Sequence, residues 1–326
     1  MTVFITGAAG FIGMNCAKAL LERGEEVVGI DNLNDYYDPK LKKARLAQLE
    51  GRKGFRFVKA DVADQDHIVR LVGELPSGSS VLHLAAQAGV RYSLVNPAAY
   101  LDANVRGQLS VLEGIRHHGQ IRHLAYASSS SVYGGNTDMP FSVNDRVDRP
   151  VSLYAATKRS AELMSWCYAH LYGLPQTALR FFTVYGPWGR PDMSAYLFTE
   201  AILNDEPIKV FNNGDMRRDF TFIDDIVAGT LAALDRPAAA EGDEPPHKVY
   251  NLGNNNSEAL MDFIHAIEDA CGRKAVMDMQ PMQPGDVKET YADIDASIHD
   301  LGFEPKTKIA EGVPRFVNWF RDYHGL

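Results

Sequence analysis

Short apolar runs alternate with longer amphipathic stretches through about residue 180 of the chain. Apolar runs of this length are typical of buried strands, and the stretches between them repeat their apolar positions at the three- and four-residue spacing of a helix. Strands that alternate with helices predict βαβ units on a parallel sheet, because each helix is long enough to cross over the sheet. We expect strands over residues 2–6, 26–30, 55–59, 80–84, 122–127 and 176–181, with helices over 11–23, 41–50, 64–74, 97–117 and 153–172.

This rhythm ends after residue 181, and a loop sequence, Gly-Pro-Trp-Gly-Arg-Pro, begins at Gly186. Helical patterns then outnumber strand patterns. We therefore predict an α/β fold with a doubly wound parallel sheet over residues 1–181 and a smaller α/β lobe over 182–326, with some strands and helices exchanged between the two. In the second lobe we expect helices over residues 193–204, 224–235, 257–271 and 307–323, with short strands near 208–211 and 248–252.

Composition places the chain among ordinary globular proteins and limits its ligands. Its 326 residues are 45% hydrophobic and 23% charged, which is close to the average for a folded protein. A formal net charge of -9 argues against the basic surface that nucleic-acid binding requires. We therefore expect no nucleic-acid partner, and any anionic ligand must be met by local positive groups.

The cysteines and the N-terminal sequence indicate a cytoplasmic protein. Cys16, Cys167 and Cys271 form no CxxC pair or Cys/His cluster, so we expect free thiols in a reducing compartment and no metal site. The N-terminus shows no basic region followed by a long apolar stretch, and no window reaches the ~18 apolar residues of a membrane-spanning helix. No membrane association is expected.

A glycine-rich turn follows the first expected strand and opens the first expected helix. Gly7, Gly10 and Gly13 are spaced GxxGxxG. Glycines at such a turn let backbone amides and a helix N-terminus approach a pyrophosphate, as in Rossmann-type dinucleotide sites, although they can also be purely conformational. Asp31 ends the second expected strand, 18 residues beyond Gly13. A carboxylate there can accept hydrogen bonds from ribose hydroxyls and repels a 2′-phosphate, which favours NAD over NADP.

Two further strand ends predict contacts to the same cofactor. Asp61 and Val62 follow the third strand, where they can reach the adenine. The segment 84–87, Leu-Ala-Ala-Gln, follows the fourth strand and is small enough to let the cofactor pass. These assignments rest on position alone, since turn-forming residues are also common at strand ends.

Tyr154 and Lys158 are four residues apart at the start of an expected helix, so their side chains can share one face. Tyr36 and Lys40 have the same spacing in a loop-like stretch, so spacing alone decides little. Only the Tyr154 pair follows a run of serines, 128–131, at the end of the fifth strand, where α/β sheets place their ligands. We therefore predict that Tyr154 and Lys158 are catalytic.

A tyrosine that acts as a base near neutral pH needs its pKa lowered from about 10 toward 7, a difference of about 4 kcal/mol between its two protonation states. We expect the Lys158 ammonium and a positively charged nicotinamide to supply this lowering in a partly dry site. Ser129 is expected to hold the substrate oxygen whose proton Tyr154 removes, although serines at a strand end are also ordinary turn formers.

These motifs resemble the extended short-chain dehydrogenase/reductase family, and within it the nucleotide-sugar epimerases. The similarity runs along nearly the whole chain. Besides the glycine turn, the serine run and the Tyr154 pair, it includes the segments 218–221 (Arg-Asp-Phe-Thr), 224–225 (Asp-Asp) and 284–286 (Pro-Gly-Asp). Three more stretches, 31–37, 87–93 and 180–187, are similar to the epimerases that act on UDP-glucuronate.

The resemblance implies C4 epimerisation of UDP-glucuronate to UDP-galacturonate with NAD as a tightly held cofactor. A hydride passes from C4 to NAD while Tyr154 deprotonates O4, the 4-keto intermediate rotates, and the hydride returns to its opposite face. Residues 1–181 would bind NAD and residues 182–326 would bind the UDP-sugar.

The resemblance, with the positional arguments above, also defines the residues of both sites. The cofactor is expected to contact Gly7, Gly10, Phe11, Ile12, Gly13, Asp31, Asn32, Asp61, Val62, Leu84, Ala85, Ala86, Gln87, Asn104, Ser128, Tyr154, Lys158 and Phe181. The substrate is expected to contact Arg91, Ser129, Ser130, Thr183, Arg190, Phe211, Arg218 and Asp286. Arg218 matches the family's diphosphate-binding arginine, and Thr183 and Arg190 match positions near the sugar carboxylate.

Two departures from the family pattern bear on the substrate. Related dehydratases and decarboxylases typically carry an acid where this chain has Ser130 and Ser131, so the serines favour plain epimerisation, which needs one base and one hydride carrier. Before Pro284 the chain reads Pro281-Met282-Gln283, where many relatives place an arginine for the diphosphate. The identity of the nucleotide therefore stays open.

Three alternatives remain at this point. They are a UDP-glucose/galactose 4-epimerase, a UDP-glucuronate decarboxylase, and a non-catalytic NAD-binding sensor, which would not need Tyr154 and Lys158. The family commonly dimerises through two helices of each subunit. A homodimer built on residues 97–117 and 153–172 is therefore expected.

Overall fold

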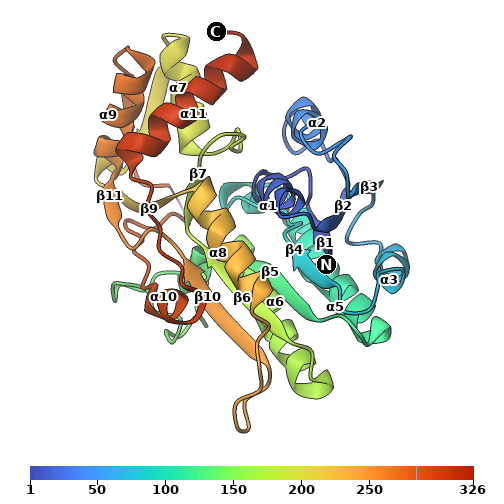
Figure 1. Ribbon diagram of the computed structural model, residues 1–326. Coiled ribbons are helices and arrows are strands. Elements are labelled where there is room, and N and C mark those ends of the chain that lie inside the picture. The colour runs from blue at the N-terminus through green and yellow to red at the C-terminus, as the bar shows by residue number, and fades with distance from the viewer. Residues whose placement is uncertain (284) are drawn as a thin grey trace.

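A seven-stranded parallel sheet forms the centre of the computed structural model, which describes residues 1–283 and 285–326. Its strand order is β10-β6-β5-β4-β1-β2-β3, as Figure 1 shows. The chain starts at β1, proceeds outward through β2 and β3, and then returns to the other side of β1 as β4, which confirms the predicted doubly wound sheet. The strands are β1 (Thr2–Thr6), β2 (Glu26–Asp31), β3 (Phe55–Lys59), β4 (Ser80–His83), β5 (His123–Ser129), β6 (Gln176–Phe181) and β10 (His247–Leu252).

Both faces of this sheet are covered by helices, which explains the continuous apolar runs of its strands. Phe4 and Val28 belong to one buried cluster, together with residues of α3, α5 and α6. Their neighbours Ile5 and Val27 face the other way, into a second cluster with residues of α1 and α8. The helices are α1 (Phe11–Glu22), α2 (Pro39–Ala47), α3 (Gln65–Gly73), α5 (Gly107–His118), α6 (Leu153–Tyr172) and α8 (Ile223–Asp235).

The helix expected over residues 97–117 is interrupted. The short α4 (Pro97–Tyr100) leads into a π-helical turn, Leu101–Arg106, before α5 begins. A π turn accommodates one extra residue per turn and is common at functional sites. Here the turn contains Asn104, whose side chain points toward the end of β4 and hydrogen-bonds Gln87.

The C-terminal part of the chain builds a smaller region beside the sheet, at the upper left of Figure 1. Three helices pack together there, and two small sheets have the orders β11-β9-β7 and β12-β8. The elements are α7 (Ser194–Leu203), α9 (Leu260–Cys271), α11 (Ile309–His324), α10 (Asp295–Leu301), β7 (Thr183–Tyr185), β8 (Pro207–Phe211), β9 (Arg217–Phe222), β11 (Ser257–Ala259) and β12 (Val276–Gln280).

Several of these elements differ from the sequence expectation. The strands β7, β9 and β12 and the helix α10 were not expected, and residues 257–259, expected as the start of a helix, form β11. β9 begins with Arg217, Arg218 and Asp219, whose charges hide the strand pattern. β10, expected in the second lobe, pairs with β6 at the edge of the large sheet.

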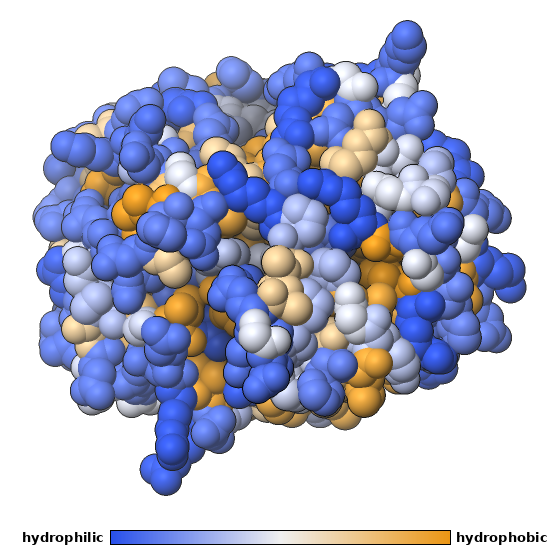
Figure 2. All heavy atoms as spheres, turned by 60° about the horizontal axis from the view of Figure 1, so that its bottom comes forward, coloured by the Kyte–Doolittle hydropathy of each residue, from blue (hydrophilic) through white to orange (hydrophobic). Residues whose placement is uncertain are grey.

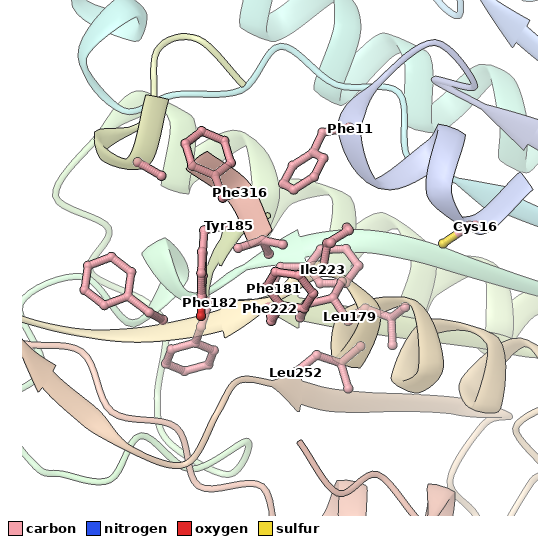
Figure 3. Packing of buried hydrophobic residues seen from close by; sticks show 14 of the residues in the cluster. Phe11, Cys16, Leu179, Phe181, Phe182, Tyr185, Phe222, Ile223, Leu252 and Phe316 are labelled. Carbon is pink, nitrogen blue, oxygen red and sulfur yellow. The ribbon is translucent and has the colours of Figure 1, made fainter. Parts of the chain in front are cut away.

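The hydrophobic core is continuous between the two regions. Figure 3 shows Phe181, the last residue of β6, packed near Phe222 at the end of β9 and Ile223 at the start of α8. Polar side chains cover most of the face in Figure 2, with apolar residues gathered mainly in hollows between them. Among the described residues, no helix combines the length and the apolar character needed to cross a membrane.

Candidate active site

A cavity opens where β1, β2, β4, β5 and β6 end. Gly7, Asp31, Ala85, Ser129 and Phe181 lie at or just beyond these five ends, and all of them line it. Parallel strands bring their carboxyl ends to one edge of the sheet, and a doubly wound sheet opens a crevice where its strand order reverses. The cavity is therefore a consequence of the topology.

The glycine-rich turn forms one wall of this cavity. Gly7 has a positive φ of 75°, and a Cβ on it would lie 2.8 Å from the backbone nitrogen of Ala85. A Cβ on Gly13 would overlap the carbonyl oxygen of Gly7. Gly10 precedes α1 with an extended backbone, and Phe11 and Ile12 of the first helical turn line the cavity. The turn therefore brings backbone amides and a helix N-terminus to the position that suits a pyrophosphate.

Asp31 lies next to this turn and is 8% exposed. Its carboxylate accepts hydrogen bonds from the backbone nitrogens of Ala9 (3.2 Å) and Leu33 (2.8 Å). The Lys42 ammonium, which the sequence analysis did not single out, lines the same cavity and donates to Asn34 at 2.5 Å. Burial lowers the pKa of Lys42, and the Asp31 carboxylate acts in the opposite direction.

Most of the other expected cofactor residues also line the cavity, but three do not. Asp61 accepts a hydrogen bond from the side chain of Asn32, which lines the cavity, at 2.9 Å. Asn104 bonds both the backbone nitrogen (2.8 Å) and the carbonyl oxygen (3.0 Å) of Gln87, and also reaches Thr157 on α6 (3.0 Å). The expected residues that line the cavity are Gly7, Gly10, Phe11, Ile12, Gly13, Asp31, Asn32, Val62, Leu84, Ala85, Ala86, Gln87, Tyr154, Lys158 and Phe181.

Ser128 is the third residue that lies away from the cavity. Its hydroxyl donates to the buried carboxylate of Glu162 at 2.6 Å. Arg180 completes this pair with two hydrogen bonds to Glu162, at 2.9 and 3.0 Å. Alternation along β5 explains the difference, because consecutive strand residues point to opposite sides, and Ser129 therefore faces the cavity.

Tyr154 and Lys158 both line the cavity from the first turns of α6. Ser152 caps this helix by accepting a hydrogen bond from the backbone nitrogen of Ala155 at 3.1 Å. The Lys158 ammonium donates to the carbonyl oxygen of Ala127 at 2.9 Å. Burial lowers the pKa of Lys158 to about 8, although the Glu162 carboxylate opposes this change.

The acidity of Tyr154 in the protein by itself is set mainly by burial. Burial raises the pKa of its phenol, while a hydrogen bond with Ser129 and the charge of Arg190 act in the opposite direction. In the protein by itself the phenol is therefore a weaker acid than free tyrosine. The expected lowering includes the charge of a nicotinamide and stays a prediction, since in the protein alone the loss of hydration outweighs the nearby polar groups.

A second cavity adjoins the first. Ser129 and Phe182 line the first cavity, while the next residues along the chain, Ser130 and Thr183, line the second. Arg218 also lines the second cavity, and its guanidinium donates to the carbonyl oxygens of Val287 (2.7 Å), Lys288 (3.0 Å) and Arg217 (2.8 Å). Burial lowers the pKa of Arg218, and Asp286 opposes this change.

Two more of the expected substrate residues pair beside this second cavity. Asp286 lines it and forms an ion pair with Arg91 at 2.9 Å. The Arg91 guanidinium also lies over the ring of Phe211, 4.4 Å from its centroid. The family-like segment 284–286 is described only from Gly285 onward, since Pro284 lies outside the described residues.

Arg190 lines the first cavity, near Tyr154, and binds Asp192 through two hydrogen bonds, at 3.0 and 2.5 Å. Asp192 also accepts a hydrogen bond from the hydroxyl of Tyr36 at 3.0 Å. Tyr36 was set aside with Lys40 as a chance match to the tyrosine-lysine spacing, but it lines the cavity. Because this contact joins residues 156 positions apart, the sequence pattern held no signal for it.

These features together define an α/β enzyme of the short-chain dehydrogenase/reductase type. They are the glycine turn that suits a pyrophosphate, the tyrosine and lysine on one helix, and the adjoining cavity that contains an arginine. The comparison with family models gives a narrower assignment. The chain belongs to the NAD dependent epimerase/dehydratase family, whose model matches residues 3–253.

Full-length relatives support this assignment. The chain is 49% identical to Protein CapI of Staphylococcus aureus, with 99% of both chains covered. It is 45% identical to UDP-glucuronate 4-epimerase 4 of Arabidopsis thaliana, with 99% of this chain and 76% of that protein covered. The structure of UDP-glucuronic acid 4-epimerase from Bacillus cereus, solved with UDP-glucuronic acid and NAD, aligns with a TM-score of 0.91 at 32% identity and covers 99% of this chain and 100% of that one.

Proposed function

We propose that this protein is an NAD-dependent epimerase that converts UDP-glucuronate to UDP-galacturonate by inverting C4. The observation that carries the proposal is the position of Ser129, Tyr154 and Lys158. They lie in the glycine-walled cavity, next to the cavity that contains Arg218. Relatives that carry the name UDP-glucuronate 4-epimerase match the chain over nearly its whole length.

The first cavity fits NAD. The close approach of Gly7 and Gly13 to neighbouring backbone leaves no room for side chains and keeps the amides of the turn open to a pyrophosphate. Asp31 lines the cavity in the position expected for a ribose. The buried side-chain nitrogen Nε2 of Gln87 has no hydrogen-bond partner among the described residues. NAD, when bound, supplies a reversible hydride acceptor for a sugar carbon.

Three residues would handle the proton. Tyr154 would remove the proton from the sugar O4 and return it, and Ser129 would hold that oxygen, since both line the first cavity. Lys158 remains largely protonated below its pKa of about 8, so its ammonium favours the phenolate form of Tyr154. The carbonyl oxygen of Ala127 fixes the ammonium in place.

The second cavity would bind the rest of the substrate. Arg218 suits the diphosphate, because a guanidinium matches phosphate geometry and this one is held by backbone carbonyls. Ser130 and Thr183 line the second cavity and are next in the chain to Ser129 and Phe182 of the first, so a sugar would lie near them. Ser130 and Ser131 provide no acid for a second proton transfer, which favours epimerisation over dehydration.

An NMR assay tests the proposal against its alternatives. Purified protein is incubated with UDP-glucuronate or with UDP-glucose, and the anomeric signals of the sugar are followed. We expect UDP-galacturonate to accumulate. Conversion of UDP-glucose alone would support the neutral-sugar epimerase, loss of carbon dioxide would support the decarboxylase, and NAD binding without any conversion would support the sensor.

We also propose that the protein is a homodimer. Exposed apolar side chains lie along α6 at Leu163, Trp166 and Leu171, and Leu101 is exposed in the adjoining π-helical turn. A second copy of the same face would cover them, as in other symmetric dimers. We expect light scattering to give a dimer mass that Trp166→Glu reduces to a monomer, while Leu197→Glu, at an exposed position on α7, leaves it unchanged.

A cytoplasmic location is proposed as well. Cys16, Cys167 and Cys271 are all free thiols, which suits a reducing compartment. Fractionation of cells that produce the protein tests this location, and recovery outside the cytoplasmic fraction would contradict it.

A further inference from the structure

Three polar side chains form a chain of contacts at the edge of the first cavity. Both Nε and one Nη of Arg190 donate to the two carboxylate oxygens of Asp192, at 3.0 and 2.5 Å. The hydroxyl of Tyr36 donates to the same carboxylate at 3.0 Å. The side chains of Arg190 and Asp192 are 22% and 28% exposed, so water reaches them only in part.

The geometry of the pair leaves one side of the guanidinium available. Asp192 takes the edge formed by Nε and Nη2. In the part of the chain that the structure describes, no hydrogen bond uses Nη1 of Arg190. The edge formed by Nη1 and Nη2 can therefore donate two parallel hydrogen bonds to a second carboxylate, because a guanidinium presents its five donors in a rigid plane.

Asp192 fixes the orientation of the Arg190 guanidinium, and the two side chains together carry little net charge. Burial alone would raise the pKa of Asp192, but the charge and hydrogen bonds of Arg190 lower it below its usual value, so Asp192 stays ionised at neutral pH. The positive charge of Arg190 is thus offset before any ligand arrives. What Asp192 adds is a fixed orientation, which reduces the ordering that a ligand must impose when it binds.

Three segments of the chain hold this arrangement. Tyr36 follows Asp31 in the loop after β2, and its ring packs 4.7 Å from the ring of Tyr92. Gly89, after β4, leaves space for the contact, since a Cβ on it would lie 3.0 Å from the Tyr36 hydroxyl and 3.3 Å from the Asp192 carboxylate. The loop that carries Arg190 is therefore tied to the loop that follows β2 and carries Tyr36.

We propose that Asp192 is a positioning residue for Arg190. It binds one edge of the guanidinium so that the other edge faces a substrate carboxylate in the cavity, and Tyr36 holds Asp192 in place. This inference rests on the proposed function, because it assigns to that same site the selection of a uronate over a neutral sugar.

Calorimetry on the NAD-bound protein tests it, in a Tyr154→Phe background that prevents turnover. Dissociation constants are measured for UDP-glucuronate, UDP-glucose and UDP. We expect Asp192→Ala to raise the constant for UDP-glucuronate about tenfold while that for UDP stays the same. Asp192→Asn, which keeps one acceptor oxygen, and Tyr36→Phe should each raise it about threefold. Asp224→Ala is the matched control, since Asp224 pairs with Arg315 on the exposed surface at 2.6 Å.

Each result decides one question. If Asp192→Ala binds UDP-glucuronate as tightly as the parent, or more tightly, Asp192 only competes with the substrate and the inference is wrong. An equal loss of affinity for UDP would show a general structural role and would also overturn it. If the parent itself does not prefer UDP-glucuronate to UDP-glucose, the proposed uronate specificity fails, whatever the variants do.

Discussion

The two cavities are built in different ways. The first is set by backbone: five strand ends, a glycine turn and the first turn of a helix form its walls, and Lys158 is fixed by a carbonyl oxygen. Beside the second, side chains pair with one another across long stretches of sequence, as Tyr36 and Asp192 also do at the edge of the first. Arg91 meets Asp286, 195 residues away, and its guanidinium covers Phe211.

This difference has a functional consequence. Backbone positions are determined by the sheet and tolerate most changes in neighbouring side chains, which suits a cofactor that all members of a family share. Paired side chains can be exchanged without changing the fold, which suits a substrate site that varies among relatives. We therefore expect mutations of the backbone-set walls and the residues fixed to them to affect folding and chemistry, and mutations of the paired side chains to affect affinity.

Arg45 joins the region of the large sheet to the loop after β7 in the smaller region, and its loss should have the largest effect. It is 0% exposed and donates to the carbonyl oxygens of Trp188 (2.7 Å) and Gly189 (3.0 Å), to that of Ala9 (3.4 Å), and to the hydroxyl of Tyr37 (2.6 Å). We expect Arg45→Met to lower the free energy of unfolding by about 3 kcal/mol, because several buried acceptors lose their donor.

Denaturant unfolding measures this change, with Arg52→Met as the control. The Arg52 side chain is 37% exposed, so its replacement should change stability by less than about 0.5 kcal/mol. An Arg45→Met protein as stable as the parent would mean that the two regions do not depend on this contact.

Tyr154 lines the first cavity, and the loss of its hydroxyl should separate chemistry from binding. We expect Tyr154→Phe to reduce kcat at least ~100-fold while NAD remains bound, because the general base is lost and the cofactor contacts are kept. Steady-state kinetics and the NAD content of the purified protein test this. Tyr168→Phe is the control on the same helix, since its hydroxyl bonds Glu113 at 2.6 Å, outside either cavity. Near-normal turnover of Tyr154→Phe would exclude Tyr154 as the base.

The contrast between the regions also explains what the sequence could predict. The strands of the large sheet and the Gly7, Asp31 and Tyr154 positions follow from local patterns, because strand ends and glycine turns are encoded by neighbouring residues. The contact of Tyr36 with Asp192 could not be predicted, since it depends on how two distant loops approach. Nor could the pKa of Tyr154, which depends on burial in the folded protein.

The ordering of Ser128 and Ser129 shows the same limit. The sequence placed both serines at a strand end, and only the pleat of β5 in the folded sheet decides which hydroxyl meets Glu162 and which meets the cavity. Similarly, the charges of Arg217 and Asp219 obscured β9, whose pairing with β7 and β11 became visible only in the tertiary structure.

Lys158 gives a pH-dependent prediction for the first region. Its pKa is lowered from 10.5 to about 8 in the folded protein, and the side chain is only 4% exposed. Between these values the unfolded chain binds the proton and the folded protein does not, so this group makes the protein more stable as the pH rises from about 8 toward 10.5. Below pH 8 the buried ammonium costs stability. Lys158→Met removes this dependence.

The quantity to compare is the free energy of unfolding of Lys158→Met minus that of the parent. We expect this difference to be about 2 kcal/mol higher at pH 7 than at pH 10. The packing change caused by the substitution affects both pH values equally and cancels in this comparison. Unfolding in denaturant at the two pH values gives the difference. Parallel profiles for parent and variant would show that burial does not perturb Lys158.

Arg218 gives the smallest expected effect and the sharpest test of the comparison, because it belongs to the second region but is held by backbone. Arg218→Lys keeps the charge and loses the planar fork that reaches Val287 and that would also bind a phosphate. We expect KM for the UDP-sugar to rise about tenfold with kcat little changed, since one or two charge-assisted hydrogen bonds are lost. Arg217→Lys is the matched control, because Arg217 is 46% exposed and pairs with Glu289. Equal effects of the two substitutions would remove Arg218 from the diphosphate site. A loss of kcat with KM unchanged would instead mean that this arginine positions the sugar for reaction, so that affinity and chemistry are not divided between the two cavities.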